Sequence, residues 1–259
     1  MFENFKNKEI NLLSFLFFLS IFARVPTVFI LGDTGLQHEW ILLVNNLVDH
    51  GVLAFSYHDH ELANYMFPNL YMPPLYAYYL YSFSIFDFNE QNYILLILFS
   101  HIFLSSLSVV FFYKLNKNFF SDKISFYSSI LFSLFPLHLY ACSQISSITL
   151  QTFLTILFFY LFFKFIKKKK IKLLLYISFV SGLLILLRQE FIAVLVFSLI
   201  YMFFFYKVSI KKILLISLIA LMTISPYLVR NILVFDTITI TKTTGYNLWK
   251  GSHPKAKGI

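Results

Sequence analysis

The sequence predicts an all-α polytopic membrane protein with about seven transmembrane helices and a long first outer loop. Hydrophobic residues make up 59% of the 259-residue chain and charged residues only 13%, so lipid must surround most of its surface. Long apolar runs alternate with short lysine-rich segments, as in a chain that crosses a bilayer repeatedly. We expect residues 1–259 to form a single transmembrane domain.

The same composition excludes several classes of protein. The formal charge of +9 does not indicate nucleic-acid binding, because the lysines lie between apolar spans, where they orient helices in the bilayer. Cys142 is the single cysteine, which excludes an internal disulfide and a multi-cysteine metal site. The first apolar segment is long enough to cross the bilayer and lacks a following small-residue cleavage site, so we expect an uncleaved first helix.

A transmembrane helix needs roughly 17 to 25 mostly apolar residues. The segment 74–88 is shorter, rich in tyrosine and preceded by proline, so we expect it to lie in the outer interface. One crossing segment is slightly short, but Lys207 at its end can extend its stem and hold its ammonium group at the interface. The predicted transmembrane segments are 11–31, 93–113, 124–141, 148–166, 171–187, 191–206 and 213–229.

Lysine placement predicts the orientation, since short cytoplasmic loops accumulate Lys and Arg. If 74–88 does not cross, every lysine cluster falls on the same side of the membrane. The sequence therefore predicts an inner (plasma) membrane protein with a cytoplasmic N-terminus, an outer loop at 32–92 and an outer C-terminal segment at 230–259. The clusters are Lys6/Lys8, Lys114/Lys117/Lys123, Lys167 to Lys170 with Lys172, and Lys207/Lys211/Lys212.

The stretch from Gly32 to Pro74 holds the largest group of acidic residues in a chain that has 12 of them. Asp33 directly follows the first apolar segment, and Glu39 precedes an amphipathic run that would lie along the membrane surface. A carboxylate at this level can meet both a lipid-borne and a water-borne substrate. In the simpler interpretation, Asp33 caps a turn and Glu39 is a solvated residue in the first turn of a helix.

Two histidines and two carboxylates lie close together in Tyr57-His58-Asp59-His60-Glu61, and such side chains can bind zinc or manganese. A metal site would need further ligands from elsewhere in the fold, and short-spaced polar residues in a loop are usually solvated. We therefore expect no metal, and the alternative is a divalent ion at His58, Asp59 and His60.

Arg188 and Arg230 lie at the outer ends of predicted helices, where a planar guanidinium can bind phosphate in two-point contact. Snorkelling to lipid headgroups is the alternative for both, and an ion pair with Glu190 is a further one for Arg188. Arg24 falls inside the first predicted helix, so we expect it to find a partner within the bundle.

Four motifs follow one another along the chain: His38-Glu39-Trp40 leading to Gly51, then Pro73-Pro74-Leu75-Tyr76, then Leu186-Leu187-Arg188-Gln189-Glu190, then Pro226-Tyr227-Leu228-Val229-Arg230-Asn231 with Gly245-Tyr246-Asn247-Leu248-Trp249-Lys250-Gly251. This order resembles the GT-C superfamily of membrane glycosyltransferases, in particular bacterial relatives of protein O-mannosyltransferases and aminoarabinose transferases. His38 stands where the family has the first acid of an Asp-Glu pair. Relatives continue beyond the position of Ile259, so we expect a minimal member or a truncated one.

The resemblance implies transfer of a sugar from a polyprenyl phosphate to a hydroxyl acceptor on the outer face, with inversion at the anomeric carbon and without a cofactor. The acceptor can be a protein, a lipid or a polysaccharide. In this scheme Glu39 is the base, with Asp33 as the fallback, and Arg188 and Arg230 contact the phosphate. The further candidates for substrate binding are Tyr71, Asn231 and Asn247.

Two other classes of function remain open at this point. One is a polytopic transporter or flippase for a lipid-linked anion, and the other is an inactive truncated relative that binds lipid or a partner. A transporter should place polar residues near the bilayer midplane of several helices. The ionisable residues of this chain lie almost entirely at predicted helix ends and in loops, which favours chemistry at the membrane interface.

Overall fold

The computed structural model describes residues 2–36, 39–56, 66–86, 88–243, 248–249 and 252, with the backbone alone for 2–8, 56, 66 and 67. The described chain forms α1 (Phe2–Leu31), α2 (Glu39–His50), α3 (Pro74–Ser84), α4 (Glu90–Asn116), α5 (Asp122–Leu134), α6 (Pro136–Ser143), α7 (Ile148–Lys168), α8 (Ile171–Leu187), α9 (Phe191–Tyr206) and α10 (Ile210–Phe235), with strands β1 (Ala54–Ser56) and β2 (Met66–Pro68).

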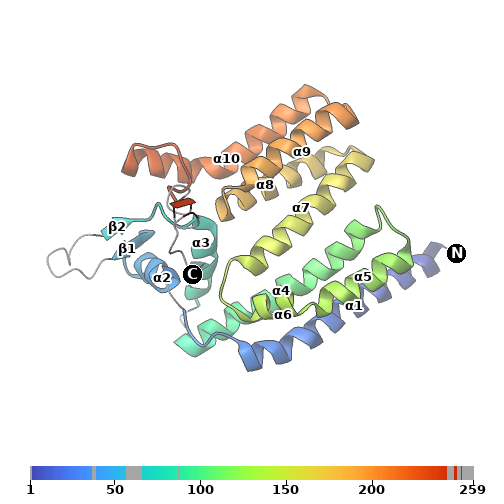
Figure 1. Cartoon of the computed structure of the whole chain (residues 1–259), viewed down its shortest axis with the longest axis horizontal. Helices are drawn as coiled ribbons and strands as arrows, with labels where there is room; N and C mark the ends of the chain where they lie inside the picture. The colour runs from blue at the N-terminus through green and yellow to red at the C-terminus, as the bar shows by residue number, and fades with distance from the viewer. Residues whose placement is uncertain are drawn as a thin grey trace.

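The long helices form two packed groups that α7 joins. Helices α1, α4, α5 and α6 lie side by side, α7 packs on α4 and α8, and α8 packs on α10 (Figure 1). The surface layer of α2, α3 and the β1–β2 hairpin sits at the opposite end of the bundle from the start of α1 (Figure 1). This arrangement confirms the predicted all-α membrane architecture.

The number of membrane crossings is not settled by helix length alone. Four helices are long and apolar enough to cross: α1 from Glu9 to Leu31, α4, α7 and α10. The bent pair α5–α6 would make a fifth. Helices α8 and α9 coincide with the predicted segments 171–187 and 191–206 but have only 17 and 16 residues. Seven crossings therefore stays a prediction.

The predicted segment 124–141 is not one straight helix, because the chain bends by 48° between α5 and α6. Pro136 begins α6, and the residue before a proline is pushed out of the helical region. Phe135 accordingly has an extended conformation, with φ −65° and ψ 120°. The break at Phe135 ends the helical hydrogen bonding of α5, and the Ser133 carbonyl accepts a hydrogen bond from a side chain of α1 instead.

That side chain is Arg24, which does find its partners inside the bundle as predicted. Arg24 is fully buried, and its Nε donates to Ser105 Oγ at 2.7 Å. Its Nη1 donates to Ser20 Oγ at 2.5 Å and to the Ser133 carbonyl at 3.1 Å. These partners lie on α1, α4 and α5, so one cation ties three helices together at the C-terminal end of α5, where the helix dipole favours positive charge.

The surface layer is built from the part of the chain that follows α1 and precedes α4. It begins with α2 at Glu39, as the amphipathic run predicts. Helix α3 starts at Pro74 and packs against α2, α4 and α8, which confirms a short helix after the proline pair. The antiparallel pairing of β1 with β2, with Phe55 opposite Phe67, was not predicted. Strands of three residues are too short to show an alternating pattern in the sequence.

Helices α8 and α10 lie close together at Gly182. A Cβ atom added there would lie 2.5 Å from Thr223 Cβ and 3.1 Å from the Ala220 carbonyl oxygen. Small residues allow this kind of close helix contact in a membrane, where apolar burial gives little net attraction between helices. The hydrogen-only side chain at Gly182 is therefore required by the packing of α10 on α8.

We expect Gly182→Leu to destabilise the folded protein by about 1 to 3 kcal/mol, the usual cost of overpacking a close contact. Gly182→Ala should have a smaller effect in the same direction. The melting temperature in detergent measures both, and Gly35→Ala is the matched control, since its nearest neighbour lies 3.6 Å from the added Cβ. A Gly182→Leu protein that melts like the unsubstituted one would contradict the close α8–α10 contact.

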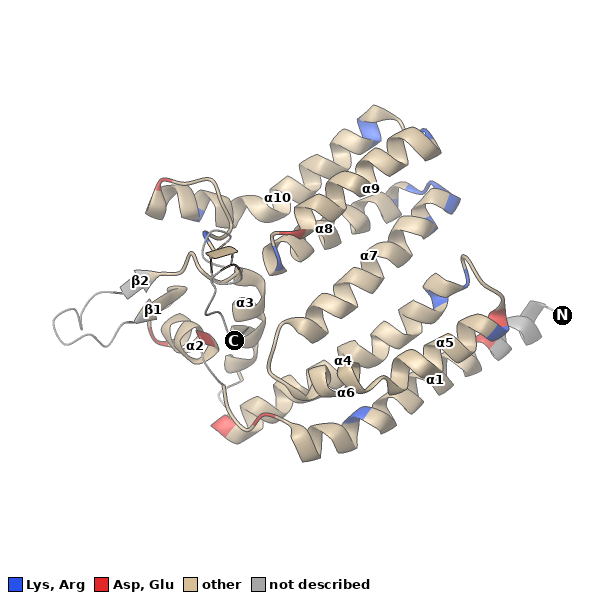
Figure 2. Cartoon of the chain, viewed as in Figure 1, with Lys and Arg blue, Asp and Glu red and all other residues tan. Residues whose placement is uncertain are grey.

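Charges of opposite sign gather at opposite ends of the bundle (Figure 2). Most lysines lie where α4 turns into α5, where α7 turns into α8 and where α9 turns into α10 (Figure 2). Most acidic residues lie at the other end, near α2 and the start of α4. Among the acidic residues whose side chains the structure describes, Glu9 and Asp122 are the exceptions at the lysine end, and both meet the same lysine.

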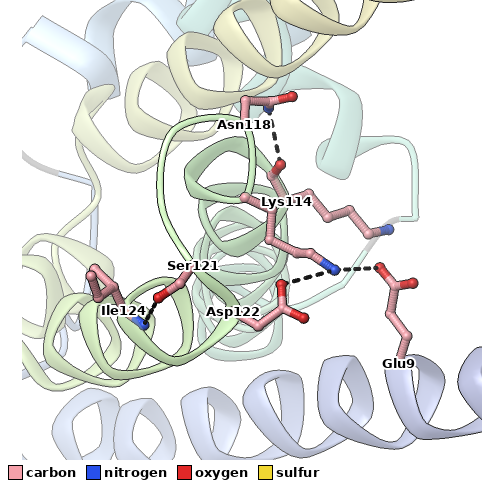
Figure 3. A network of polar contacts seen from close by, with 7 residues as sticks. Glu9, Lys114, Asn118, Ser121, Asp122 and Ile124 are labelled. Atoms are coloured by element: carbon pink, nitrogen blue, oxygen red, sulfur yellow. Dashed lines mark hydrogen bonds and ion pairs between the residues drawn. The ribbon is translucent and has the colours of Figure 1, made fainter.

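That lysine is Lys117, whose ammonium group lies 3.3 Å from Asp122 and 3.8 Å from Glu9, so it links the starts of α1 and α5 to the end of α4 (Figure 3). Burial alone would lower the pKa of Lys117, but Tyr113, Glu9 and Asp122 outweigh it and raise the pKa. The three side chains are substantially exposed, so the contribution to stability is small.

Candidate active site

A cavity of about 1340 Å³ lies between the surface layer, the α8–α9 turn and the segment after α10. It is found at the end of the bundle where the acidic residues gather. Side chains from parts of the chain that are far apart in sequence meet on its walls. The lining residues are Glu39, Trp40, Tyr71, Met72, Pro73, Tyr76, Ser147, Leu187, Arg188, Gln189, Glu190, Ile192, Ala193, Val196, Phe197, Thr241, Thr243 and Leu248.

Helix α2 contributes a carboxylate and an aromatic ring to the cavity. Glu39 is the first residue of α2, where the positive end of the helix dipole favours a negative charge. Trp40 follows it and meets Tyr76 edge to face, with ring centroids 4.8 Å apart. Glu39 has no hydrogen-bond or ion-pair partner among the described residues and is half-buried, so its carboxylate is available to a molecule in the cavity.

Tyr76 presents a neutral phenol to the cavity. Burial, with Tyr79, Tyr93 and Asp33 nearby, raises the pKa of Tyr76 well above its ordinary value. Its hydroxyl lies 3.3 Å from His101 Nε2 on α4, which fixes the ring from behind. Burial likewise raises the pKa of Tyr79 to about 12, against the hydrogen bond with Ser100, which lowers it. Tyr76 and Tyr79 therefore carry no charge at physiological pH.

The α8–α9 turn contributes Arg188 to the opposite wall. Its Nη1 lies 3.9 Å from Glu190 Oε1, and the two side chains are 42% and 64% exposed. Such an exposed and loose ion pair contributes little, so an anion entering the cavity can compete for Arg188. The ion pair considered for Arg188 from the sequence is therefore present but weak.

The turn that carries Arg188 is held by the segment after α10. Gln189 Oε1 accepts a hydrogen bond from the Thr241 amide at 3.2 Å, and Thr241 is buried. Thr241 and Thr243 both line the cavity. Sequence reasoning missed these threonines together with Trp40, Ser147 and Gln189. The threonine-rich run from Thr237 to Thr244, which follows the last apolar segment, is a signal that could have identified the two threonines. No such signal marks Trp40, Ser147 or Gln189.

Asp33 does not line the cavity. Its Oδ2 accepts a hydrogen bond from the Ile145 amide at 2.6 Å, and its own amide donates to the Ser143 carbonyl at 3.1 Å. These contacts fix the loop after α1 to the loop between α6 and α7. The carboxylate of Asp33 thus joins two distant loops rather than capping the turn that follows it, whereas Glu39 lines the cavity.

Arg230 and Asn231 also lie outside the cavity walls. Arg230 donates to the carbonyls of Asn69, at 2.7 Å, and Leu53, at 3.1 Å. Asn231 is fully buried, accepts from Arg230 Nη1 at 2.8 Å and donates to the Thr239 carbonyl at 2.6 Å. Arg230 thus binds the surface layer and Asn231 binds the segment after α10, and neither lines the cavity with Glu39 and Arg188.

Among the remaining candidates, Tyr71 lines the cavity and is 45% exposed. Asn247 lies outside the described residues, as do His58, Asp59 and His60 of the alternative metal site. Within the described part of the chain, no three His, Cys, Asp or Glu side chains lie close enough together to hold a metal ion.

Comparison with known families identifies the chain. The family described as dolichyl-phosphate-mannose-protein mannosyltransferase matches residues 72–229, which is more than half of the sequence. The chain belongs to this mannosyltransferase family. No curated protein matches the chain.

Membership of the dolichyl-phosphate-mannose-protein mannosyltransferase family makes the chain a membrane glycosyltransferase of the GT-C type. The matched region contains Met72, Tyr76, the α8–α9 turn with Arg188, and α9. Glu39 lies before it. The family thus covers the arginine side of the cavity, while the structure brings the carboxylate of α2 to the same place.

Proposed function

We propose that the cavity is the active site and transfers a sugar from a polyprenyl phosphate to a hydroxyl acceptor on the outer face of the membrane. One observation carries this proposal: Glu39 from α2 and Arg188 from the α8–α9 turn line the same cavity, although 149 positions separate them in the sequence. A carboxylate and a guanidinium are the two groups that such a transfer needs.

The chemistry explains why these two groups suffice. The acceptor hydroxyl gives its proton to Glu39 as its oxygen bonds to the anomeric carbon of the sugar. The bond from that carbon to the phosphate oxygen breaks, and its electron pair stays on the phosphate. Phosphate is a weakly basic leaving group, so it needs a positive charge rather than an acid, and Arg188 supplies that charge in a two-point contact. Attack from the face opposite the phosphate inverts the anomeric carbon.

The walls of the cavity match a substrate that is part lipid and part sugar. Ile192, Val196 and Phe197 on α9 line the cavity and are 48%, 46% and 70% exposed. This apolar face of α9 offers a path for a polyprenyl chain from the surrounding lipid. The Trp40 ring on the other side, which Tyr76 supports from behind, suits a sugar because its flat apolar face and its polar N–H match the two kinds of surface that a sugar has.

The outer location rests on lysine placement. The lysine clusters lie at the bundle end opposite the cavity, and cytoplasmic loops accumulate lysine (Figure 2). The position of the cavity at one end of the bundle favours an interfacial enzyme over a transporter for a lipid-linked anion, because the binding site of a transporter lies near the bilayer midplane. The buried cation inside the bundle, Arg24, is engaged by serine and carbonyl oxygens.

We expect single cysteines at Ser56 and Ser209 to label from opposite faces, once Cys142 is replaced by alanine. Ser56 ends β1 in the surface layer and Ser209 precedes α10 at the lysine end. A membrane-impermeant maleimide should label the Ser56 position in intact cells and the Ser209 position only after permeabilisation. Labelling of both positions from one face would contradict the proposed orientation.

The donor and the acceptor can be identified in cells. Mass spectrometry of outer-face glycans and of polyprenyl-phosphate sugars should show one glycan lost and one polyprenyl-phosphate sugar accumulated in a deletion strain. Complementation with the intact gene restores both, whereas a gene carrying Glu39→Gln does not. An unchanged set of glycans and lipid-linked sugars in the deletion strain would argue against the proposed transfer.

A further inference from the structure

The turn between β2 and α3 forms one wall of the cavity, and a single buried side chain organises it. Asn69 is 1% exposed. Its Oδ1 accepts from the Tyr71 amide at 2.9 Å and the Met72 amide at 2.8 Å, and its Nδ2 donates to the Met72 carbonyl at 2.7 Å. A local network of this kind replaces the hydrogen bonds that the turn backbone would otherwise lack.

The backbone of Asn69 is held in turn by α10. Arg230 Nη1 donates to the Asn69 carbonyl at 2.7 Å and Nη2 to the Leu53 carbonyl at 3.1 Å. The Leu53 carbonyl also accepts from the Asn69 amide at 2.8 Å. The two arms of one guanidinium thus bridge the two chain segments that flank the hairpin. The Arg230 Cζ atom also lies 5.5 Å from the ring centroid of Tyr227 and 5.2 Å from that of Phe235.

We infer that Asn69 and Arg230 are positioning residues, here called the Asn69–Arg230 clamp, which hold Tyr71, Met72 and Pro73 in place as the substrate-facing wall. The activity part of this inference rests on the proposed function. In the clamp, Arg230 acts through the turn rather than on the donor phosphate. Its rigid fork matters because a lysine at this position could reach only one of the two carbonyls at a time.

A third tie joins the turn to the other side of the cavity. The Lys242 amide donates to the Leu70 carbonyl at 2.9 Å. Lys242 lies between the cavity residues Thr241 and Thr243, and Thr241 donates to Gln189 beside Arg188. The turn that the Asn69–Arg230 clamp organises is therefore also tied, through Leu70, to the segment that holds Arg188. Together these contacts set the distance across the cavity between Tyr71 and Arg188, and a substrate must fit that distance.

Amide hydrogen exchange of the 69–73 segment tests the clamp directly, because the Tyr71 and Met72 amides are the ones that Asn69 binds. We expect Asn69→Ala to speed exchange there about tenfold or more, since each lost hydrogen bond is worth roughly 1 kcal/mol and 1.4 kcal/mol corresponds to tenfold. Asn69→Asp keeps the Oδ1 acceptor but replaces the Nδ2 donor with an oxygen that faces the Met72 carbonyl, so its exchange should be faster than that of the unsubstituted protein and slower than that of Asn69→Ala. Arg230→Lys, which leaves the Asn69 side chain intact, should also fall between the unsubstituted protein and Asn69→Ala.

Kinetics separate positioning from mere stability. Asn69→Ala is expected to raise KM roughly tenfold while kcat changes little, and Asn69→Asp, which keeps the Oδ1 acceptor and loses the Nδ2 donor, should have a smaller effect on KM. Asn118→Ala is the matched control, because the Asn118 side chain also binds backbone groups of its own segment, the carbonyls of Lys114 and Leu115, but lies at the lysine end. Figure 3 shows its contact with Lys114. Asn118→Ala should leave both the exchange of 69–73 and KM unchanged.

The outcomes distinguish the clamp from the proposed function. Faster exchange in Asn69→Ala and Arg230→Lys, in a protein that shows no transfer, would uphold the clamp and reject the transferase proposal. Unchanged exchange in Asn69→Ala would overturn the clamp. If Asn69→Ala does not fold, Arg230→Lys decides. If Arg230→Lys raises the KM for the donor but leaves the amide exchange of the 69–73 segment unchanged, Arg230 contacts the donor phosphate itself and the clamp is wrong for Arg230.

Discussion

Replacing Glu39 with glutamine is expected to lower kcat by about 10²- to 10⁴-fold, the usual range for a lost general base. The substitution keeps the shape of the side chain and removes its ability to take a proton. Glu39 has no hydrogen-bond or ion-pair partner among the described residues, so the fold should not depend on its charge. The measurement is the rate of sugar transfer at saturating donor, with donor binding measured separately.

The control for this experiment is Glu90→Gln. Glu90 is also a glutamate at the first position of a helix at the same end of the molecule, but it does not line the cavity. It should retain full activity. Asp33→Asn should act mainly on stability, because its carboxylate accepts the Ile145 amide. Full activity of Glu39→Gln together with a dead but folded Asp33→Asn would assign the base to Asp33 instead.

Arg188→Lys is expected to lower kcat/KM for the donor by roughly 10- to 100-fold, because lysine keeps the charge but loses the planar fork that fits phosphate. Kinetics at limiting donor concentration measure the effect. Glu190→Gln supplies the comparison, since it removes the only ion-pair partner of Arg188 among the described residues. If the Arg188–Glu190 pair is merely structural, the two substitutions should have equal and small effects.

If Arg188 binds the donor, Glu190→Gln should leave donor use unchanged or improve it, because it frees the guanidinium. Unchanged kinetics of Arg188→Lys at limiting donor would remove Arg188 from the active site. The cavity would then lack its phosphate contact, and the family function would have to use another cation.

Helix positions were largely predictable because their ends are marked in the sequence. Helices α8 and α9 occupy the predicted 171–187 and 191–206, since Lys170 and Arg188 bound one and Lys207 ends the other. The bend at Phe135 was missed, although Pro136 announces it, because the apolar run continues across it. The length of an apolar run predicts that a helical segment is present, but it does not predict whether that segment is straight.

Some residues of the candidate site were predictable from their type and position in the sequence, whereas others depend on contacts between distant parts of the chain. Glu39 and Arg188 were selected as residue types at helix ends, and the structure places both on one cavity. Arg230 was selected by the same argument, but its partner Asn69 is 161 positions away and cannot be read from local sequence. Helix α10 also continues past Arg230 to Phe235, beyond the predicted end at residue 229. An arginine near the end of an apolar segment binds whichever oxygen the fold brings to it, and the sequence does not say which.

The transfer reaction in purified protein tests the central claim most directly. The protein is reconstituted with a panel of labelled polyprenyl-phosphate sugars and membrane extract as acceptor, and the release of free polyprenyl phosphate is measured over time. We expect one donor to be consumed by the unsubstituted protein and by Glu90→Gln, and we expect Glu39→Gln to be slower by at least about 10²-fold. Equal release by the unsubstituted protein and by Glu39→Gln would contradict the assignment of this cavity as the active site.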